Sequence, residues 1–100
     1  MIVGIIGSGG REHAICCKIR DSSKISKIFC IPGNAGTSYI AENVNIKVDD
    51  FKSIKEFCLI NKIELLIVGP EQPLVKGIVD YFSDTKIKVF GPNRIASQLE

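Results

Sequence analysis

Three glycine-containing segments of this 100-residue chain hold the residues that could do chemistry. They span residues 7–11, 32–37 and 69–73, and each directly follows an apolar stretch. Glycines at the start of a helix leave backbone N–H groups bare, and such groups can bind an anion or a polar sugar. The segments therefore point to a binding site for a small polar molecule.

The first segment reads Gly-Ser-Gly-Gly-Arg and follows the apolar run 2–6. Residues with so little side chain can turn a strand into a helix whose first N–H groups are unpaired and whose dipole is positive at that end. Arg11 stands where this helix opens. Its guanidinium could pair with a phosphate or carboxylate of a ligand, or with Glu12 or Asp21 at the surface. The alternative for the glycines is an ordinary tight turn.

The spacing Gly7-x-Gly9 is also the start of a dinucleotide-binding fingerprint, but the pattern breaks twice. The third glycine of the fingerprint falls on Glu12. The acidic residue that would bind the ribose of NAD is missing, because the end of the second expected strand, residues 30–33, reads Cys-Ile-Pro-Gly. NAD binding therefore has little support. His13 is interpreted as a packed or capping residue, since no nucleophile or carboxylate partner is evident for it.

The other two segments offer polar side chains. Asn34 tolerates left-handed backbone and can present a donor and an acceptor to a ligand hydroxyl, although a solvent-exposed turn has a similar composition. The polar connection 34–43 is too long for a minimal turn, which favours a functional loop. Glu71 stands at an expected helix start, where its carboxylate could accept hydrogen bonds from vicinal ribose hydroxyls. It could equally stabilise the helix dipole by roughly 0.3–1 kcal/mol.

Composition and charge exclude several classes of protein. The chain is 45% hydrophobic and 24% charged, which is ordinary for a soluble globular domain. A net charge of +2 with scattered lysines gives little support for nucleic-acid binding. No apolar run is long enough to span a membrane, and the start of the chain does not resemble a signal peptide. The four cysteines form no Cys-x-x-Cys pair, so we expect free thiols in the cytoplasm and neither a disulfide nor a zinc site.

Short β-rich runs alternate with helical stretches, which predicts an α/β domain. The expected fold is a Rossmann-like open parallel sheet of about five strands with helices on both faces. Ligands of such sheets bind beyond the carboxyl ends of the strands, where all three segments lie. Alternation of Val44, Ile46 and Val48 with polar residues places the third strand near an edge. The expected strands span residues 2–6, 25–31, 44–48, 63–68 and 87–90.

Apolar residues at helical spacing predict the helices. The helix after the first strand should bury Ala14, Ile15 and Ile19, and a short last helix should follow residues 91–93. Asp49 or Asp50 is expected to cap the helix after the third strand. The clearest stripe predicts one helix after residues 69–73. The expected buried residues of these last two helices are Ile54, Phe57 and Cys58, and Leu74, Val75, Ile78, Val79 and Phe82.

The quoted segments resemble one family over essentially the whole chain: phosphoribosylamine–glycine ligase, also called glycinamide ribonucleotide synthetase. The resemblance implies that residues 1–100 are an N-terminal pre-ATP-grasp domain, with ATP-grasp and C-terminal domains expected after Glu100. The motifs on which this resemblance to the family rests are Gly-Ser-Gly-Gly-Arg-Glu-His-Ala at 7–14, Pro-Gly-Asn-Ala-Gly-Thr at 32–37, Asn-Val-Asn-Ile at 43–46, Gly-Pro-Glu at 69–71, Pro-Leu-Val at 73–75, Gly-Pro at 91–92 and Gln-Leu-Glu at 98–100.

This family joins glycine to 5-phosphoribosylamine in purine biosynthesis. ATP phosphorylates the glycine carboxylate, and the amine of phosphoribosylamine then attacks the glycyl phosphate. The resemblance implies that ATP and Mg²⁺ or Mn²⁺ bind mainly to the domains absent here, so we expect the fragment alone to be inactive and to hold no catalytic or metal-binding residue. The resemblance leaves two places for the substrate phosphate, the glycine-containing segment 7–11 and a missing domain. The implied substrate-binding residues are Ser8, Gly9, Gly10, Arg11, Asn34, Gly36 and Glu71.

Two other functions remain open. The chain could be the N-terminal domain of another purine-pathway ATP-grasp ligase, although His13 beside Arg11 and Glu12 and the run 32–37 argue against it. It could instead be a non-catalytic nucleotide-binding Rossmann module, which micromolar NAD binding would support. The expected partners are the two small-molecule substrates and the remaining domains of its own chain, without nucleic acid or membrane.

Overall fold

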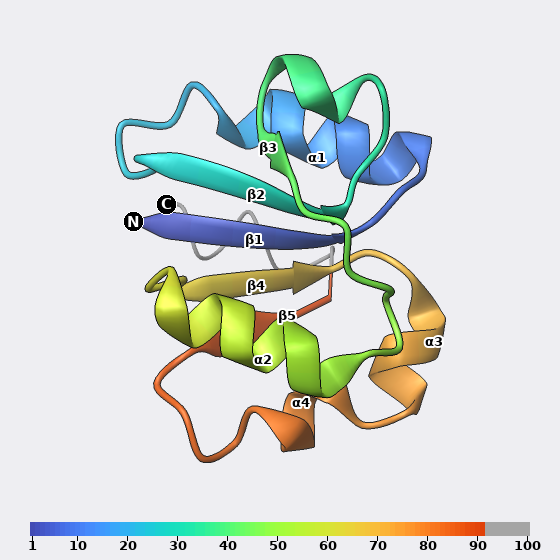
Figure 1. The fold of residues 1–100 in the computed structure, drawn as a ribbon. Coiled ribbons are helices and arrows are strands. Elements are labelled where there is room, and N and C mark those ends of the chain that lie inside the picture. The colour runs from blue at the N-terminus through green and yellow to red at the C-terminus, as the bar shows by residue number, and fades with distance from the viewer. Residues whose placement is uncertain (92–100) are drawn as a thin grey trace.

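The sheet is the centre of the fold. A computed structural model describes residues 1–91 and contains five parallel strands in the order β3-β2-β1-β4-β5 (Figure 1). The predicted α/β class and open parallel sheet are confirmed, whereas the predicted helix after residues 91–93 lies outside the described residues. The elements are β1 (Ile2–Gly7), α1 (Gly10–Ile19), β2 (Lys27–Pro32), the 3₁₀ turn η1 (Thr37–Tyr39), β3 (Glu42–Asn43), α2 (Phe51–Ile60), β4 (Leu65–Val68), α3 (Glu71–Val75), α4 (Ile78–Tyr81) and β5 (Lys88–Phe90).

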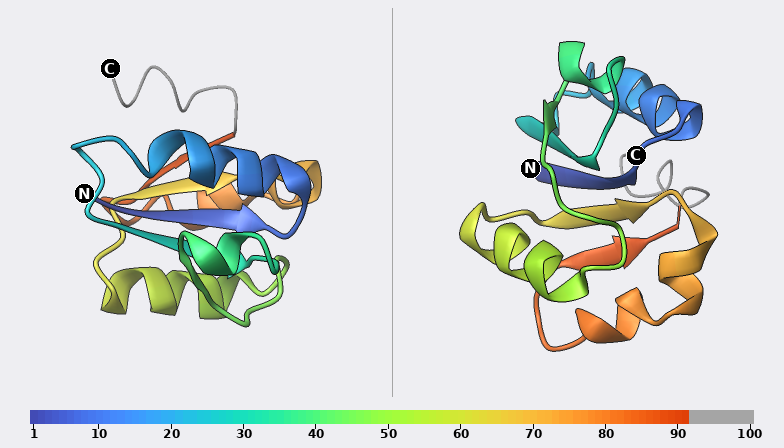
Figure 2. Two further views of the ribbon diagram at one scale, coloured as in Figure 1. Left: turned by 90° about the horizontal axis from the view of Figure 1, so that it is seen from above. Right: turned by 45° about the vertical axis from the view of Figure 1, so that its right-hand side comes forward.

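Helices cover both faces of the sheet, as predicted (Figure 2). Because side chains alternate along a strand, each central strand contributes apolar residues to two cores. In β4, Leu65 and Ile67 pack on the side of α1, and Leu66 and Val68 pack on the side of α2. All four are buried, so the central strand is covered on both faces.

The predicted cap of α2 is present, but the predicted burial of two helical residues needs correction. α2 begins after Asp50, whose Oδ1 accepts a hydrogen bond from the Ser53 N–H at 3.2 Å. Hydrogen bonding from the Ser53 hydroxyl first, and from this N–H second, lowers the pKa of Asp50. Ala14, expected on the buried face of α1, is exposed, while Cys16 is buried. Phe57 of α2 is only half-buried. Among the described residues, no helix has both the length and the apolar character needed to cross a bilayer.

The third strand lies earlier in the chain than its alternating pattern predicted. β3 is an edge strand, as expected, but it consists of Glu42 and Asn43 and pairs with β2. Val44 still donates its N–H to the Cys30 carbonyl at 2.8 Å, and the chain then turns away from the sheet. Val44, Ile46 and Val48 pack partly buried against the core on the α2 side. Their alternation therefore reflects a segment that covers the core without strand pairing.

The expected single helix over residues 74–82 is instead two short helices. Gly77 has a φ of +92°, a left-handed conformation that interrupts the helix between α3 and α4. The break changes which residues face the core: Ile78 and Phe82 are buried, but Val75 is 77% exposed and Val79 is 47% exposed. The apolar spacing therefore predicted the buried residues of this segment only in part.

Substituting alanine at Gly77 should lower the free energy of unfolding by about 1–2 kcal/mol, because an L-residue pays roughly that cost in the left-handed region. No neighbouring atom lies within 4 Å of an added Cβ, so backbone strain is the whole effect. Thermal unfolding of Gly77→Ala, Gly77→Asn and Lys76→Ala would measure it. Asparagine should retain more stability than alanine, and Lys76→Ala, where φ is −78°, should match the parent chain. Equal melting temperatures for all three variants would contradict this explanation.

Candidate functional site

The three glycine-containing segments meet at one end of the sheet. β1 lies between β2 and β4, so the segments that follow these three strands leave adjacent carboxyl ends. Two backbone hydrogen bonds join them: Gly33 donates to the Gly7 carbonyl at 3.1 Å, and Gly69 donates to the Ile6 carbonyl at 3.0 Å. The expected convergence is therefore present in the structure.

Glu12 fills the space behind the glycine turn, which we define as residues 7–10. Its side chain is only 6% exposed, and Oε1 accepts a hydrogen bond from the Gly9 N–H at 3.2 Å. The carboxyl group packs against Gly7 and Gly69, where an added Cβ would overlap it; at Gly69 this Cβ would lie 2.6 Å from Cδ of Glu12. Both glycines are needed because a buried carboxylate occupies the position where their side chains would be.

A cleft opens in front of this carboxylate. It has a volume of about 440 Å³ and lies between the glycine turn and the start of α3. Arg11 borders it and donates from Nη1 to the Gly69 carbonyl at 3.2 Å, which ties the first segment to the third. Glu71 is exposed at the first position of α3 and borders the same cleft. The residues that line it are Gly9, Gly10, Arg11, Glu12, Gly69, Pro70 and Glu71.

Asn34 joins the second segment to the glycine turn. Its Nδ2 donates to the carbonyls of Ser8 and Gly9 at 2.9 and 3.1 Å, and its Oδ1 accepts from the Thr37 N–H at 2.9 Å. Both amide hydrogens are thus used within the protein, so Nδ2 has none left for a ligand in this arrangement. Asn34 orders the loop, and its predicted contact with substrate stays a prediction.

Thr37 and Asn43 also hold the second segment in place. The Thr37 side chain is fully buried, and its Oγ1 accepts from the Asn34 N–H at 2.8 Å and lies 2.7 Å from Oδ1 of Asn43. Gly33 needs its φ of +76° here, and a Cβ on it would overlap the Asn43 amide. The loop that was predicted to be functional is therefore held in one conformation by side-chain hydrogen bonds.

His13 packs beside Gly36 of this loop. A Cβ on Gly36 would lie 3.0 Å from Cε1 of the His13 ring, and His13 is half-buried. This placement agrees with the interpretation of His13 as a packed residue.

The predicted site residues fall into two neighbouring groups. Four of them line the cleft, whereas the other three belong to the glycine turn and the loop that Asn34 fastens to it. Sequence reasoning missed Glu12 as part of the site, although its position in the broken dinucleotide fingerprint was a usable signal. The cleft group is Gly9, Gly10, Arg11 and Glu71, and the adjoining group is Ser8, Asn34 and Gly36.

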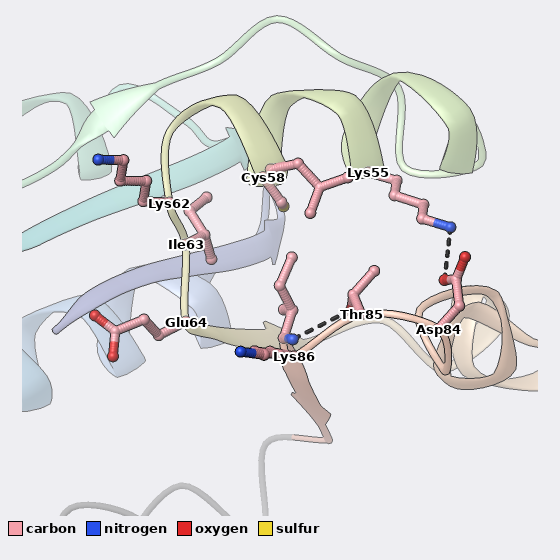
Figure 3. Close-up of a pocket in the computed structure, with 10 residues that line it drawn as sticks. Lys55, Cys58, Lys62, Ile63, Glu64, Asp84, Thr85 and Lys86 are labelled. Carbon is pink, nitrogen blue, oxygen red and sulfur yellow. Dashed lines mark hydrogen bonds and ion pairs between the residues drawn. The ribbon is translucent and has the colours of Figure 1, made fainter.

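A second hollow, of about 450 Å³, lies where β4 and β5 begin (Figure 3). The Lys55 Nζ atom pairs at 2.7 Å with Oδ1 of Asp84 beside it, and Lys62 and Lys86 point outward at its rim (Figure 3). It contains none of the predicted site residues. We therefore place the candidate site at the glycine turn, where the segments with unusual chemistry converge.

Comparisons with known proteins agree on one family. The family model described as "Phosphoribosylglycinamide synthetase, N domain" matches residues 1–100. A phosphoribosylamine–glycine ligase of Caldanaerobacter subterraneus subsp. tengcongensis is 53% identical over 100 residues, and one of Haemophilus influenzae is 48% identical over 102 residues; each alignment covers 100% of this chain and 24% of the relative. The chain thus spans about a quarter of the length of the curated relatives it matches.

The fold is similar to that of a solved member. The crystal structure of phosphoribosylamine–glycine ligase from Thermotoga maritima aligns with a TM-score of 0.58 and 29% identity. The alignment covers 92% of this chain and 19% of that one. The likeness in sequence and in structure therefore extends along nearly the whole chain.

Proposed function

The chain belongs to the phosphoribosylglycinamide synthetase N-domain family, and on this basis we propose that it supplies the 5-phosphoribosylamine site of a ligase that joins this amine to glycine. The observation that carries the proposal is the cleft where Glu71, Arg11 and the glycine turn meet. Bare backbone lets a sugar approach closely, and a carboxylate can accept hydrogen bonds from its hydroxyls. In the proposed site, Glu71 binds the ribose hydroxyls.

The charges of the cleft favour the sugar and amine end of the substrate over its phosphate. Two carboxylates and one guanidinium border it, and the Gly9 N–H already donates to Glu12. A phosphate at the glycine turn would compete with this buried carboxylate and would be repelled by it. We therefore assign the phosphate to basic residues elsewhere in the full-length protein. The same carboxylate argues against a dinucleotide pyrophosphate at this turn and thus against the nucleotide-sensor alternative.

We further propose that ATP and Mg²⁺ or Mn²⁺ bind mainly to other domains of the full-length enzyme. Within residues 1–91, no group of three or more His, Cys, Asp or Glu side chains is positioned to hold a metal ion. In the proposed enzyme, other domains bind ATP and the metal and activate the glycine. The role of this chain is to hold the amine in position for attack.

A chimaeric enzyme tests the proposal. The 100 residues of this chain would replace the aligned segment of the Caldanaerobacter ligase, to which they are 53% identical. We expect formation of glycinamide ribonucleotide that depends on ATP, glycine and 5-phosphoribosylamine, because the transplanted segment would restore the sugar site. The control is the same ligase without the segment, which should be inactive. A folded chimaera that still binds ATP but makes no product would refute the proposal.

A further inference from the structure

Two buried thiols lie in contact beneath the candidate site. Sγ of Cys16 in α1 and Sγ of Cys30 in β2 are 3.1 Å apart, and neither residue has exposed surface. No sequence pattern pairs them, because they belong to different elements and are not part of a Cys-x-x-Cys motif. Both remain free cysteines in this structure.

The two sulfur atoms lie little more than a bond length apart. A disulfide has an S–S distance of about 2.0 Å, so bond formation needs a movement of only about 1 Å. One thiol donates a hydrogen bond to the other sulfur, and this interaction lowers the pKa of Cys30 while it raises that of Cys16. Reactivity toward an oxidant follows thiolate character and exposure, and because neither sulfur is exposed, peroxide reaches the pair through local opening of the fold. Either sulfur can donate the hydrogen bond between them, but the Thr37 hydroxyl also lowers the pKa of Cys30 and no such group acts on Cys16. Cys30 is therefore the expected nucleophile, and Cys16 is the resolving thiol.

We propose that Cys16 and Cys30 form a dithiol that a hydroperoxide converts into a reversible disulfide. The Cys30 thiolate attacks one oxygen of hydrogen peroxide, forms sulfenic acid and releases hydroxide. The Cys16 sulfur then attacks the sulfenic sulfur, the S–S bond forms, and the sulfenic oxygen leaves as water with the thiol proton. The pair is oxidised by two electrons, and the peroxide is reduced to two waters. Cytosolic disulfides of this kind are typically transient and redox-sensing.

The disulfide would join two elements that carry the candidate site. Cys16 lies one helical turn after Glu12 in α1, and Cys30 lies shortly before Asn34, which fastens the second segment to the glycine turn. The other two cysteines lack such a partner. Cys17 is half-exposed beside Cys16 on the helix, and Cys58 lies in the core on the opposite face of the sheet, where burial raises its pKa to about 12.

The test is peroxide treatment of the folded full chain, followed by denaturation, alkylation and peptide mapping by mass spectrometry. We expect two of the four thiols to become resistant to alkylation, a fragment that links Cys16 to Cys30, and recovery of both thiols after reduction. Cys17→Ser and Cys58→Ser should form the same link, whereas Cys16→Ser and Cys30→Ser should not. Circular dichroism before treatment would confirm that each variant is folded.

The wild-type map decides the proposal even where a variant fails to fold, because fragmentation distinguishes Cys16 from Cys17 directly. A link through Cys17 or Cys58 would overturn it. Four alkylatable thiols after treatment, or a sulfinic acid without a link, would also overturn it. None of these readouts requires ligase activity, so the result is independent of the proposed function.

Discussion

Replacing Glu71 with glutamine in the chimaeric ligase is expected to raise the KM for 5-phosphoribosylamine by about 10- to 100-fold with a smaller change in kcat. The amide keeps the size of the side chain but loses the charge that strengthens hydrogen bonds to the ribose hydroxyls. A hydrogen bond to a charged group contributes about 1.5–3 kcal/mol, and 1.4 kcal/mol corresponds to a factor of ten in affinity. Initial rates at varied phosphoribosylamine, with ATP and glycine saturating, would measure the effect.

The KM values for ATP and glycine should stay unchanged, because the proposed role of Glu71 concerns the sugar alone. Glu56→Gln is a matched control, since Glu56 is an exposed carboxylate on α2, away from the cleft. It should leave all kinetic constants unaltered. Unchanged kinetics for Glu71→Gln in an active chimaera would remove Glu71 from the site.

Alanine at Gly7 should destabilise the chain by about 3 kcal/mol, a large part of the stability of a domain of this size. Gly7 has a φ of +133°, which an L-residue adopts only with strain, and the added Cβ would overlap Oε1 of the buried Glu12. Backbone strain and overpacking each typically cost about 1–3 kcal/mol. Thermal or urea unfolding of Gly7→Ala against the parent chain would measure the loss.

Two further variants separate the causes. Gly10→Ala is the matched control: no atom lies within 4 Å of its Cβ and the residue is already helical, so its stability should be unchanged or slightly higher. In the Glu12→Ala background, the added cost of Gly7→Ala should fall, because only the backbone strain remains. An equal cost in both backgrounds would show that the Glu12 carboxyl group does not restrict this position.

Most of the fold was predictable because its signals are local. The glycines between β1 and α1 and the uninterrupted apolar run of β4 each indicate a local structure from neighbouring residues alone. The errors arose where a local pattern had two solutions. The apolar alternation of 44–48 fits either a strand or a chain that covers the core, and Gly77 can be accommodated in a helix or can end it.

The candidate site was predictable only in outline. Parallel strands place their following loops at one end of a sheet, so the convergence of the three segments could be deduced from their order. The partners of individual side chains could not. Asn34 was expected to face a ligand, but its amide fastens two loops together. Glu12 was considered only as a surface partner of Arg11, although it is buried behind both Gly7 and Gly69.

The order of residues along the chain was enough to specify a parallel α/β sheet with a glycine turn at the carboxyl end of its first strand, because backbone preference and apolar spacing act over a few neighbouring residues. Two contacts emerged only when the elements packed together: a buried carboxylate occupies that turn, and the thiols of Cys16 and Cys30 touch beneath it. Both contacts depend on how α1 packs against the sheet. A packing distance between separate elements is set by all the side chains between them, so no local stretch of sequence specifies it.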